Sequence, residues 1–203
     1  MNLRKHLTDH QPNENTVWKE FTSGNTEAFD LLMSSHFRVL FQYGSKFSKD
    51  KEFIKDCIQD LFLILWEKRE NLDKNAVVKP YLLASLRRLM HRSISSKSWI
   101  GDKYIEESDG IFEIEFSVEE QYIENEATHV RAQQLKHLLD ELPKRQKEVI
   151  YLKFFQNMDR NQISEVMDVT PQTVSNLLQI AIKQLKKHWK EAFFTLLVIH
   201  LLL

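Results

Sequence analysis

The chain has 203 residues, of which 42% are apolar, and its formal net charge at pH 7 is −1. Only four glycines and four prolines are present, too few for the tight turns of an all-β fold, and long stretches repeat apolar residues every three or four positions. The single cysteine, Cys57, excludes an intramolecular disulfide and is expected to be a small core residue. We therefore predict an all-α protein with one domain or two small ones.

The small net charge hides a segregation of charge along the chain. Residues 27–99 carry 13 Lys and Arg against 9 Asp and Glu, residues 100–126 carry 1 against 10, and residues 127–190 carry 11 against 6. Basic segments are compatible with phosphate contacts, although solvated helix faces would give the same counts. The alternation predicts two basic modules on either side of an acidic linker.

The N-terminal part predicts a polar arm, Met1 to Asn15, and a short helix, Thr16 to Phe21. A longer helix follows Asn25, and its broad apolar face consists of Phe29, Leu32, Met33, His36, Phe37 and Leu40. We expect His36 to be packed or hydrogen-bonded, because no Cys or His at ligand spacing accompanies it. The eight histidines are scattered, and we predict no metal site and no cofactor.

The segment from Lys51 to Glu70 predicts the most apolar internal helix. Its inward stripe consists of Ile54, Cys57, Ile58, Leu61 and Leu65. The opposite face mixes apolar and polar residues, namely Asp56, Gln59, Asp60, Leu63 and part of Trp66. An apolar patch rimmed by carboxylates is typical of a protein-docking surface, whereas a helix buried nearly all round is the alternative. A polar loop, Asn71 to Lys79, follows and ends at Pro80.

The next predicted helix, Pro80 to Ser98, is basic on one side. Leu82, Leu86, Leu89 and Met90 are expected to be buried. The outward residues are expected to be Arg87, Arg88, His91, Arg92 and Ser95, with Tyr81 and Trp99 at the two ends. Such a face suits a nucleic-acid backbone and unstacked bases, and a merely solvated face is the alternative.

The acidic segment from Ile100 to Glu126 contains Phe112, Ile114 and Phe116 at a spacing of two, as in a strand, but no partner strand is evident. We predict a linker that is part extended and part helical. A helix from Thr128 to Pro143 then carries Leu135, Leu138, Leu139 and Leu142. Pro143 starts another helix, with Val149, Ile150, Leu152 and Phe154. These helices are expected to complete a small four-helix domain.

Two short helices joined by a tight turn are predicted between Asp159 and Lys187. Asp159 and Gln162 form a capping box at the start of the first helix, whose apolar positions are Ile163, Val166 and Met167. Asp168 and Val169 are left as the turn, and Thr170 followed by Pro171 starts the second helix. The apolar stripe of the second helix is Val174, Leu177, Leu178, Ala181 and Leu185.

The second helix also has polar and basic residues that could contact DNA. They are Gln172, Thr173, Ser175, Asn176, Gln179, Lys183, Lys186 and Lys187. Gln and Asn can pair bidentately with adenine, and a helix fits the major groove. An ordinary amphipathic helix is the alternative, but the Thr-Pro start, the short turn and the Lys-rich end favour a DNA-binding helix-turn-helix.

The last stretch, Ala192 to Leu203, is almost entirely apolar. As a helix it would span only about 18 Å, short of the roughly 30 Å hydrocarbon core of a bilayer. It could pack on the protein, bind a partner helix or contact a membrane surface. The N-terminus lacks a cationic and apolar leader, so we expect the protein in the cytoplasm.

The order of these pieces resembles the extracytoplasmic-function (ECF) sigma factors of bacterial RNA polymerase, of the compact kind common in Bacteroidetes. The resemblance rests on DCIQDLFLILWEKRE, PYLLASLRRLMHRSI and LDELPKRQKEVIYLKFFQNMDRNQISEVMDVTPQTVSNLLQIAIKQLK. It implies region two over residues 25–99, the acidic linker over 100–127 and region four over 128–190. An arm and short helix, 1–24, precede them, and the apolar tail, 191–203, follows.

The resemblance also implies partners and residue roles. The partner would be the polymerase core, through its β′ clamp helices and β flap. The helix with Asp56, Gln59, Asp60, Leu63 and Trp66 would dock on the clamp helices. The 71–79 loop and the basic helix would open the −10 promoter element through Tyr81, Arg87, Arg88, His91 and Arg92. The helix from Pro171 would bind the −35 element, with Lys183, Lys186 and Lys187 on phosphates. The linker would run through the RNA-exit path.

The resemblance further implies an anti-sigma factor partner, usually membrane-anchored, and neither a small-molecule substrate nor catalysis by the chain itself. Two departures from the family pattern stand out. Leu177, Ile180 and Ile182 replace arginines that many relatives carry along the recognition helix, which predicts weak unaided DNA binding. Arg88 stands where relatives usually carry Asn.

Two other classes of protein were weighed. A stand-alone helix-turn-helix regulator would bind DNA as a dimer without the polymerase core, and would need no basic helix beside a docking helix. An enzyme is disfavoured because the sequence contains no glycine-rich phosphate loop, no metal-ligand spacing and no nucleophile elbow.

Overall fold

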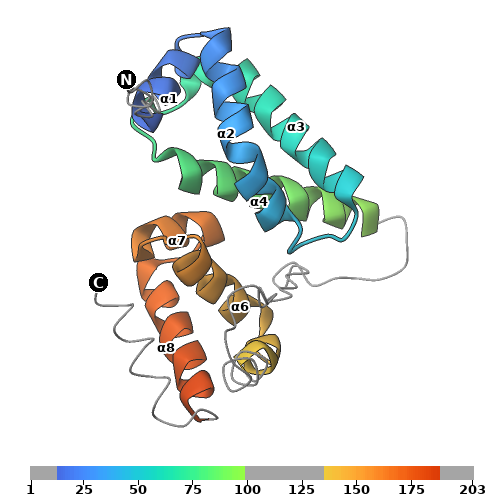
Figure 1. The fold of residues 1–203 in the computed structure, drawn as a ribbon, viewed down its shortest axis with the longest axis vertical. Coiled ribbons are helices and arrows are strands. Elements are labelled where there is room, and N and C mark those ends of the chain that lie inside the picture. Colours follow the sequence, from blue (N-terminus) through green and yellow to red (C-terminus); the bar gives the residue numbers. More distant parts are fainter. Residues whose placement is uncertain (1–12, 99–134, 188–203) are drawn as a thin grey trace, which may run out of the picture.

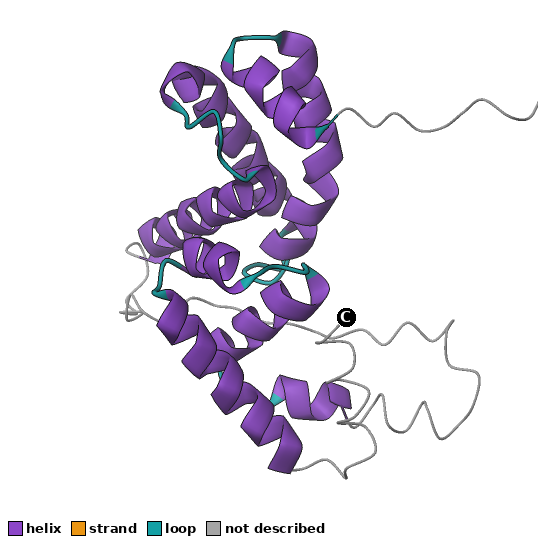
Figure 2. Cartoon of the chain, turned by 90° about the vertical axis from the view of Figure 1, so that its left-hand side faces the viewer, coloured by secondary structure: helices purple, strands orange, loops and turns teal. Residues whose placement is uncertain are grey.

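The computed structural model describes residues 13–98, called the first module below, and residues 135–187, called the second module. Over these ranges every regular element is helical, as Figure 2 shows, which confirms the all-α prediction. None of these helices is long and apolar enough to cross a membrane. The expectations for the N-terminal arm up to residue 12, the acidic linker and the apolar tail concern residues outside the described ranges.

Side-chain caps start the helices of the first module. These helices are α1 (Glu14–Thr22), α2 (Thr26–Gly44), α3 (Lys51–Lys68), the short 3-10 helix η1 (Arg69–Asn71) and α4 (Val78–Ser98). Asn13, Asn25 and Asp50 each accept a hydrogen bond from a backbone amide of the first turn of α1, α2 and α3. Because Asn13 provides the cap, α1 begins two residues before the predicted Thr16.

The core of the first module includes α1. Trp18 and Phe21 are buried against α2, and the indole Nε1 of Trp18 donates to the carbonyl of Asp73 at 2.9 Å, across the loop before α4. The packed module therefore extends upstream of residue 25, where the sequence places the start of region two. Gly24, with φ of +91°, allows the tight turn between α1 and α2.

The apolar stripes predicted for α2 and α3 are largely confirmed. Every predicted inward residue of α3 is buried, and Phe62 joins them. On α2 the departure is Phe37, which is 37% exposed and stacks on Phe41 at the surface. Close approach of the two helices needs a glycine, since a Cβ on Gly44 would lie 2.7 Å from Cγ2 of Ile54.

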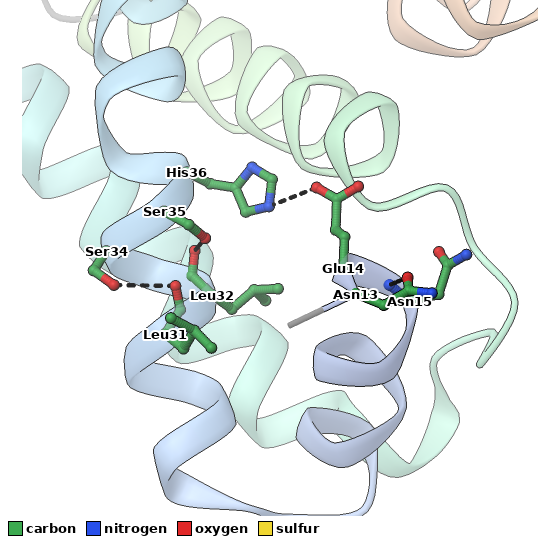
Figure 3. Close-up of polar contacts among 8 residues, drawn as sticks. All are labelled: Asn13, Glu14, Asn15, Leu31, Leu32, Ser34, Ser35 and His36. Carbon is green, nitrogen blue, oxygen red and sulfur yellow. Dashed lines mark hydrogen bonds and ion pairs between the residues drawn. The ribbon is translucent and has the colours of Figure 1, made fainter. Parts of the chain in front are cut away.

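His36 is a buried histidine with a partner on the neighbouring helix. Figure 3 shows its ring on α2 pointing toward Glu14 on α1, with 3.0 Å between Nε2 and Oε1. Burial lowers the pKa of His36, and the Glu14 carboxylate opposes this shift only in part. The prediction of a packed, hydrogen-bonded histidine is confirmed.

The basic helix α4 begins at Val78, two residues before the predicted start at Pro80. Pro80 therefore lies inside the first turn, where a backbone N–H has no partner within the helix and its loss costs nothing. All four apolar residues predicted to be buried in this helix are buried.

The second module contains the predicted helix-turn-helix. Its elements are a helical segment over residues 135–140, α6 (Lys144–Ile150), the π-helix η3 (Tyr151–Phe155), α7 (Arg160–Met167) and α8 (Pro171–Lys187). The capping box at Asp159 and Gln162 is present, and Thr170 Oγ1 accepts from the amide of Thr173 at 3.1 Å. Asp168, with φ of +53°, ends α7 in the left-handed conformation and turns the chain toward α8.

The two modules pack against each other. In Figure 1, helices α1 to α4 form the upper body, and α6, α7 and α8 form the lower one. The contact is made chiefly by α4 and α7, while α8 packs on α6 and α7 and runs away from the first module. The basic helix of the first module therefore lies at the junction.

Candidate functional site

The outer face of α3 is open to solvent. Asp56, Gln59 and Asp60 are exposed, and Leu63 is 58% exposed. These positions are three, four and seven residues apart, so they share one stripe. The alternative of a helix buried nearly all round is wrong, and the stripe combines two carboxylates, an amide and an uncovered leucine, as a docking surface needs.

Trp66 differs from the other residues assigned to this face. Its ring is only partly exposed, because it packs on Phe21 and Phe29 with centroid distances of 6.2 and 5.2 Å. The guanidinium of Arg69 lies over the ring, 4.5 Å from its centroid. Trp66 thus links the docking stripe to the core of the first module and fixes the end of α3.

The polar side of α8 is exposed along its length. Gln172, Asn176, Gln179, Lys183 and Lys186 are exposed, whereas Thr173 and Ser175 are partly covered. The helix packs through Val174 and Ala181, which are buried, and through the partly buried Leu177, Leu178 and Leu185. Lys187 closes the helix, and only its backbone is described.

The hydrogen bonds of α8 leave groups suited to base edges. Gln172 Nε2 donates to Asn176 Oδ1 at 3.0 Å, so Gln172 Oε1 and Asn176 Nδ2 stay available as an acceptor and a donor. Adenine presents the complementary donor and acceptor in the major groove. Ser175 instead donates to the carbonyl of Pro171 at 3.2 Å, and Thr173 pairs with Thr170. Gln172 and Asn176 are therefore better placed for base contacts than Thr173 and Ser175.

The second module covers one part of the basic face of α4 and leaves the other part exposed. Arg88 and Arg92 are exposed, as predicted. Arg87 is not: its side chain is 17% exposed and pairs with Glu148 of α6. His91 is half-buried beside the Phe47 ring, with centroids 5.4 Å apart, and Tyr81 packs edge-on against Trp18. The prediction that Arg87 and His91 point into solvent is wrong, because that side of α4 faces the second module.

Glu148 is the centre of a buried polar cluster, called the Glu148 network below, formed with Tyr43 and Arg87. The Tyr43 hydroxyl donates to Glu148 Oε1 at 2.7 Å. Arg87 Nε donates to the same oxygen at 2.8 Å, and Arg87 Nη2 donates to Oε2 at 3.3 Å. The Glu148 side chain is 3% exposed, and two helices of the first module supply its donors. Both carboxylate oxygens are thus satisfied across the junction.

The charges in this cluster perturb their neighbours. Burial would lower the pKa of Arg87, but the Glu148 carboxylate and its hydrogen bond outweigh it, so the pKa is raised and Arg87 stays charged. Burial and the nearby carboxylate raise the pKa of Tyr43, which stays protonated and donates. Burial and the positive charge of Arg87 lower the pKa of His91. Arg87 therefore meets Glu148 as a charged donor beside a neutral imidazole.

Two further contacts join the modules. Lys79, at the start of α4, donates through Nζ to the carbonyl of Gln156 at 2.9 Å. The Tyr43 and Tyr151 rings are stacked, with centroids 6.1 Å apart and planes 12° from parallel. Tyr151 belongs to the π-helix η3, whose wider turn follows α6 directly.

Sequence reasoning missed Glu148 as the shared partner of Tyr43 and Arg87. Tyr43 is the last aromatic residue of an apolar helix, and Glu148 follows the basic run Lys144, Arg145 and Lys147. The one signal was a lone acidic residue directly before the buried Val149 and Ile150. Within the described ranges, no group of His, Cys, Asp or Glu could hold a metal ion.

Comparison with known families gives two matches. The family model described as "Sigma-70 region 2" matches residues 32–100, and the one described as "Sigma-70, region 4" matches residues 132–185. Together they cover well over half of the chain, in the order of the two modules. No curated protein sequence matches the chain.

Solved structures share the fold. One is a structure of CnrH in complex with the cytosolic domain of CnrY, with 18% identity and a TM-score of 0.57, covering 86% of this chain and 95% of that one. Another is the sigma factor RpoE in complex with the anti-sigma factor NepR from Bartonella quintana, with 17% identity and a TM-score of 0.53, covering 80% and 94%. At these identities the likeness concerns the fold.

With regions 2 and 4 as its matched regions, the chain belongs to the sigma-70 family of sigma factors. A sigma factor binds the RNA polymerase core and promoter DNA and directs transcription initiation. These partners fit an exposed docking stripe on α3 and an exposed polar face on α8.

Proposed function

We propose that this sigma factor uses α3 to bind the polymerase core, α4 to open the −10 element and α8 to recognise the −35 element. The observation that carries the proposal is the separation of three polar faces on three helices, each pointing away from the core of its own module. Residues 25–99 and 128–190 are the proposed region two and region four, with the acidic linker between them. On sequence resemblance, we propose that it is a sigma factor of the extracytoplasmic-function type, in the group of that type common in Bacteroidetes.

The proposed core-binding surface is the α3 stripe of Asp56, Gln59, Asp60 and Leu63, with Trp66 fixing its end. Because Gln59 and Asp60 are exposed, replacing both with Ala removes polar contacts without opening the module. We expect a weaker complex with the β′ clamp helices and unchanged helical content. Affinity for purified core polymerase, measured by fluorescence anisotropy, tests this expectation.

A matched control is available on α2, where Gln42 and Asp30 are also exposed. The Gln42→Ala and Asp30→Ala double variant removes the same chemical groups from another face. Its affinity for the core should equal that of the wild type. Equal affinities for all three proteins would reject the α3 assignment.

The proposed −10 contacts are Tyr81, Arg87, Arg88, His91 and Arg92, with the loop before α4. Support comes from the exposed Arg88 and Arg92 and from the anchoring of that loop to Trp18. Extracting a base from a duplex costs a few kcal/mol, which cationic and stacking contacts can offset. Arg88→Ala with Arg92→Ala should slow promoter opening by the holoenzyme, as followed by permanganate footprinting. Normal opening rates would remove these arginines from the proposal.

The proposed −35 contacts are Gln172, Thr173, Ser175, Asn176 and Gln179, with Lys183, Lys186 and Lys187 on phosphates. Asn176→Ala should change the preferred −35 sequence, since an amide that contacts a base contributes about 1–3 kcal/mol of discrimination. Run-off transcription with core polymerase on a library of −35 elements measures the preference. Asn15→Ala, an exposed asparagine on α1, serves as the control. Identical preferences for wild type and Asn176→Ala would exclude this contact.

We further propose where the protein acts and which other partner it has. The protein acts in the cytoplasm, where its polymerase and DNA partners are. It catalyses no reaction of its own, since sigma factors act as initiation factors. An anti-sigma factor, with a membrane anchor, contacts the protein as NepR contacts RpoE in the similar complex. Specific promoter binding by the purified chain without core polymerase would instead indicate a stand-alone helix-turn-helix regulator.

A further inference from the structure

We propose that the Glu148 network is an internal latch of the free sigma factor: Glu148 of the second module holds Arg87 of the first and keeps it from promoter DNA until the modules separate. The proposal rests on the proposed function of α4 as the −10 helix. It adds a regulatory contact within the chain, made by residues of the two modules themselves.

The Glu148 carboxylate and a DNA phosphate compete for the Arg87 side chain. Arg87 Nε and Nη2 both donate to the Glu148 carboxylate, at 2.8 and 3.3 Å, in the fork geometry that a phosphate would also occupy. The Nε and Nη2 edge of the guanidinium cannot bind both anions at once, and the side chain is only 17% exposed. A DNA phosphate must therefore displace a buried carboxylate that also accepts from Tyr43 at 2.7 Å.

The two promoter elements lie farther apart than the docked modules can span. The −10 and −35 elements lie about 25 base pairs apart by their positions, which is about 85 Å at 3.4 Å per base pair. α4 has 21 residues, α7 has 8 and α8 has 17, so even end to end the three would span only about 69 Å. Since α7 joins them by direct packing on both, the docked modules cannot reach both elements. Promoter binding requires the Glu148 network to open.

The polar groups of the junction are hydrogen-bonded at Glu148 but not at every neighbouring side chain. His91 Nε2 is buried with no hydrogen-bond partner among the described residues, and its neutral ring lies next to the Arg87 charge. An unsatisfied buried nitrogen opposes docking, whereas the fully paired carboxylate favours it. The closed arrangement therefore depends on the contacts of Glu148, and a competing anion at Arg87 can open it.

The experiment measures docking without DNA. Cysteines introduced at the exposed Gln42 of α2 and Lys144 of α6 carry a fluorescent donor and acceptor on the full chain, while Cys57 is buried and reacts slowly. Glu148→Gln keeps the shape of the side chain but removes the charge that pairs with Arg87. We expect lower energy transfer than in the wild type, with unchanged helical circular dichroism.

Two variants complete the series. Tyr43→Phe removes one donor to Glu148 and keeps the ring, so transfer should fall by less than for Glu148→Gln. Glu141→Gln makes the same chemical change at an exposed site outside the junction and should leave transfer unchanged. Wild-type transfer in both Glu148→Gln and Tyr43→Phe overturns the latch. Should Glu148→Gln not fold, Tyr43→Phe decides alone.

DNA binding separates the latch from the function on which it rests. A single-stranded −10 oligonucleotide should bind free Glu148→Gln about fivefold more tightly than free wild type, because Arg87 is released. Lower transfer with unchanged DNA affinity would keep the latch and reject Arg87 as a −10 contact. Unchanged transfer would reject the latch, whatever the DNA affinity.

Discussion

The faces of α4 and α8 that carry the candidate DNA contacts have similar sequence patterns but lie in different environments. Each helix buries an apolar stripe in its own module and presents polar or basic residues on the other side. The α8 face is open, whereas the α4 face is half covered by the second module through Arg87 and His91. An amphipathic pattern therefore identifies the side that leaves its own core, but not whether water or another module covers that side.

The chemistry of the side chains explains the difference. On α8 the candidate base contacts are neutral amides and hydroxyls that pair within the helix, as Gln172 does with Asn176. On α4 the side chain at the junction is a guanidinium, which can be buried only with a counter-ion and hydrogen bonds. Glu148 supplies both. Coverage of the α4 face therefore depends on the Arg87–Glu148 pair, whereas the open face of α8 depends on no such charge pair.

The largest expected effect comes from breaking that pair. Arg87→Ala leaves the buried Glu148 carboxylate without its cation, and removing one partner of a buried pair costs about 3–5 kcal/mol when the structure cannot relax. Separation of the modules relieves part of that cost, so we expect the lower end, about 3 kcal/mol, as lost docking free energy. Arg88→Ala, at an exposed position one residue away, should change stability by less than about 0.5 kcal/mol.

Urea denaturation followed by circular dichroism and by energy transfer between the modules provides the measurement. For Arg87→Ala, energy transfer should be lost at lower urea than helicity, whereas the two curves stay together in Arg88→Ala. Equal docking in Arg87→Ala and Arg88→Ala would mean that the charge pair does not hold the junction.

A smaller effect distinguishes the helix caps of the two modules. Asp159→Ala removes both the amide contacts of the α7 cap and the capping box with Gln162, at a cost of about 1 kcal/mol in the second module. Asp50→Ala removes the corresponding cap of α3 and should destabilise the first module instead. Hydrogen exchange of the amides in α7 and α3 should show each loss in its own module. Loss of protection in both modules from either variant would indicate that they unfold as one unit.

A weaker perturbation is pH. The pKa of His91 in the closed form is lowered below 6.5 by burial and by Arg87, with the facing Glu148 carboxylate opposing the shift. The open or unfolded form thus takes up the proton first. The contribution of neutral His91 to docking is therefore fully present above about pH 6.5 and is lost as the pH falls from there toward the lowered pKa.

Energy transfer measured from about pH 7.5 to about pH 5.5 should therefore decrease in the wild type and change less in His91→Gln. His36 shifts in the same direction but lies within the first module, so His36→Gln should alter the pH dependence of unfolding and not of docking. An identical pH profile for wild type and His91→Gln would assign the change to other groups.

The smallest effect on stability is expected on the open face. Asn176→Ala loses only an exposed side-chain contact to Gln172, so the free energy of unfolding should change by less than about 0.5 kcal/mol. The same variant is expected to change the −35 preference in transcription. A large loss of stability would show that the amide supports the fold of α8 and that its transcription phenotype has a structural cause.

The sequence determined most of the local structure. Apolar spacing predicted the buried stripes of α3, α4 and α8, because each helix must bury one side in its own module. Asp159, Gln162, Thr170 and Pro171 predicted the helix-turn-helix, because capping and turn chemistry act between residues close in the chain. The exposed stripe of Asp56, Gln59, Asp60 and Leu63 on α3 followed from the same period.

Only the tertiary structure decided which outward faces stay open. Tyr43, Arg87 and Glu148 lie on three helices from two modules. Glu148 is 105 residues from Tyr43 and 61 residues from Arg87 along the chain, so no local periodicity relates them. Their pairing depends on how α7 and α6 pack against α4 and α2, where burial makes an opposite charge necessary. Helix spacing fixes the faces within each module, and long-range packing selects which of those faces remain free to bind.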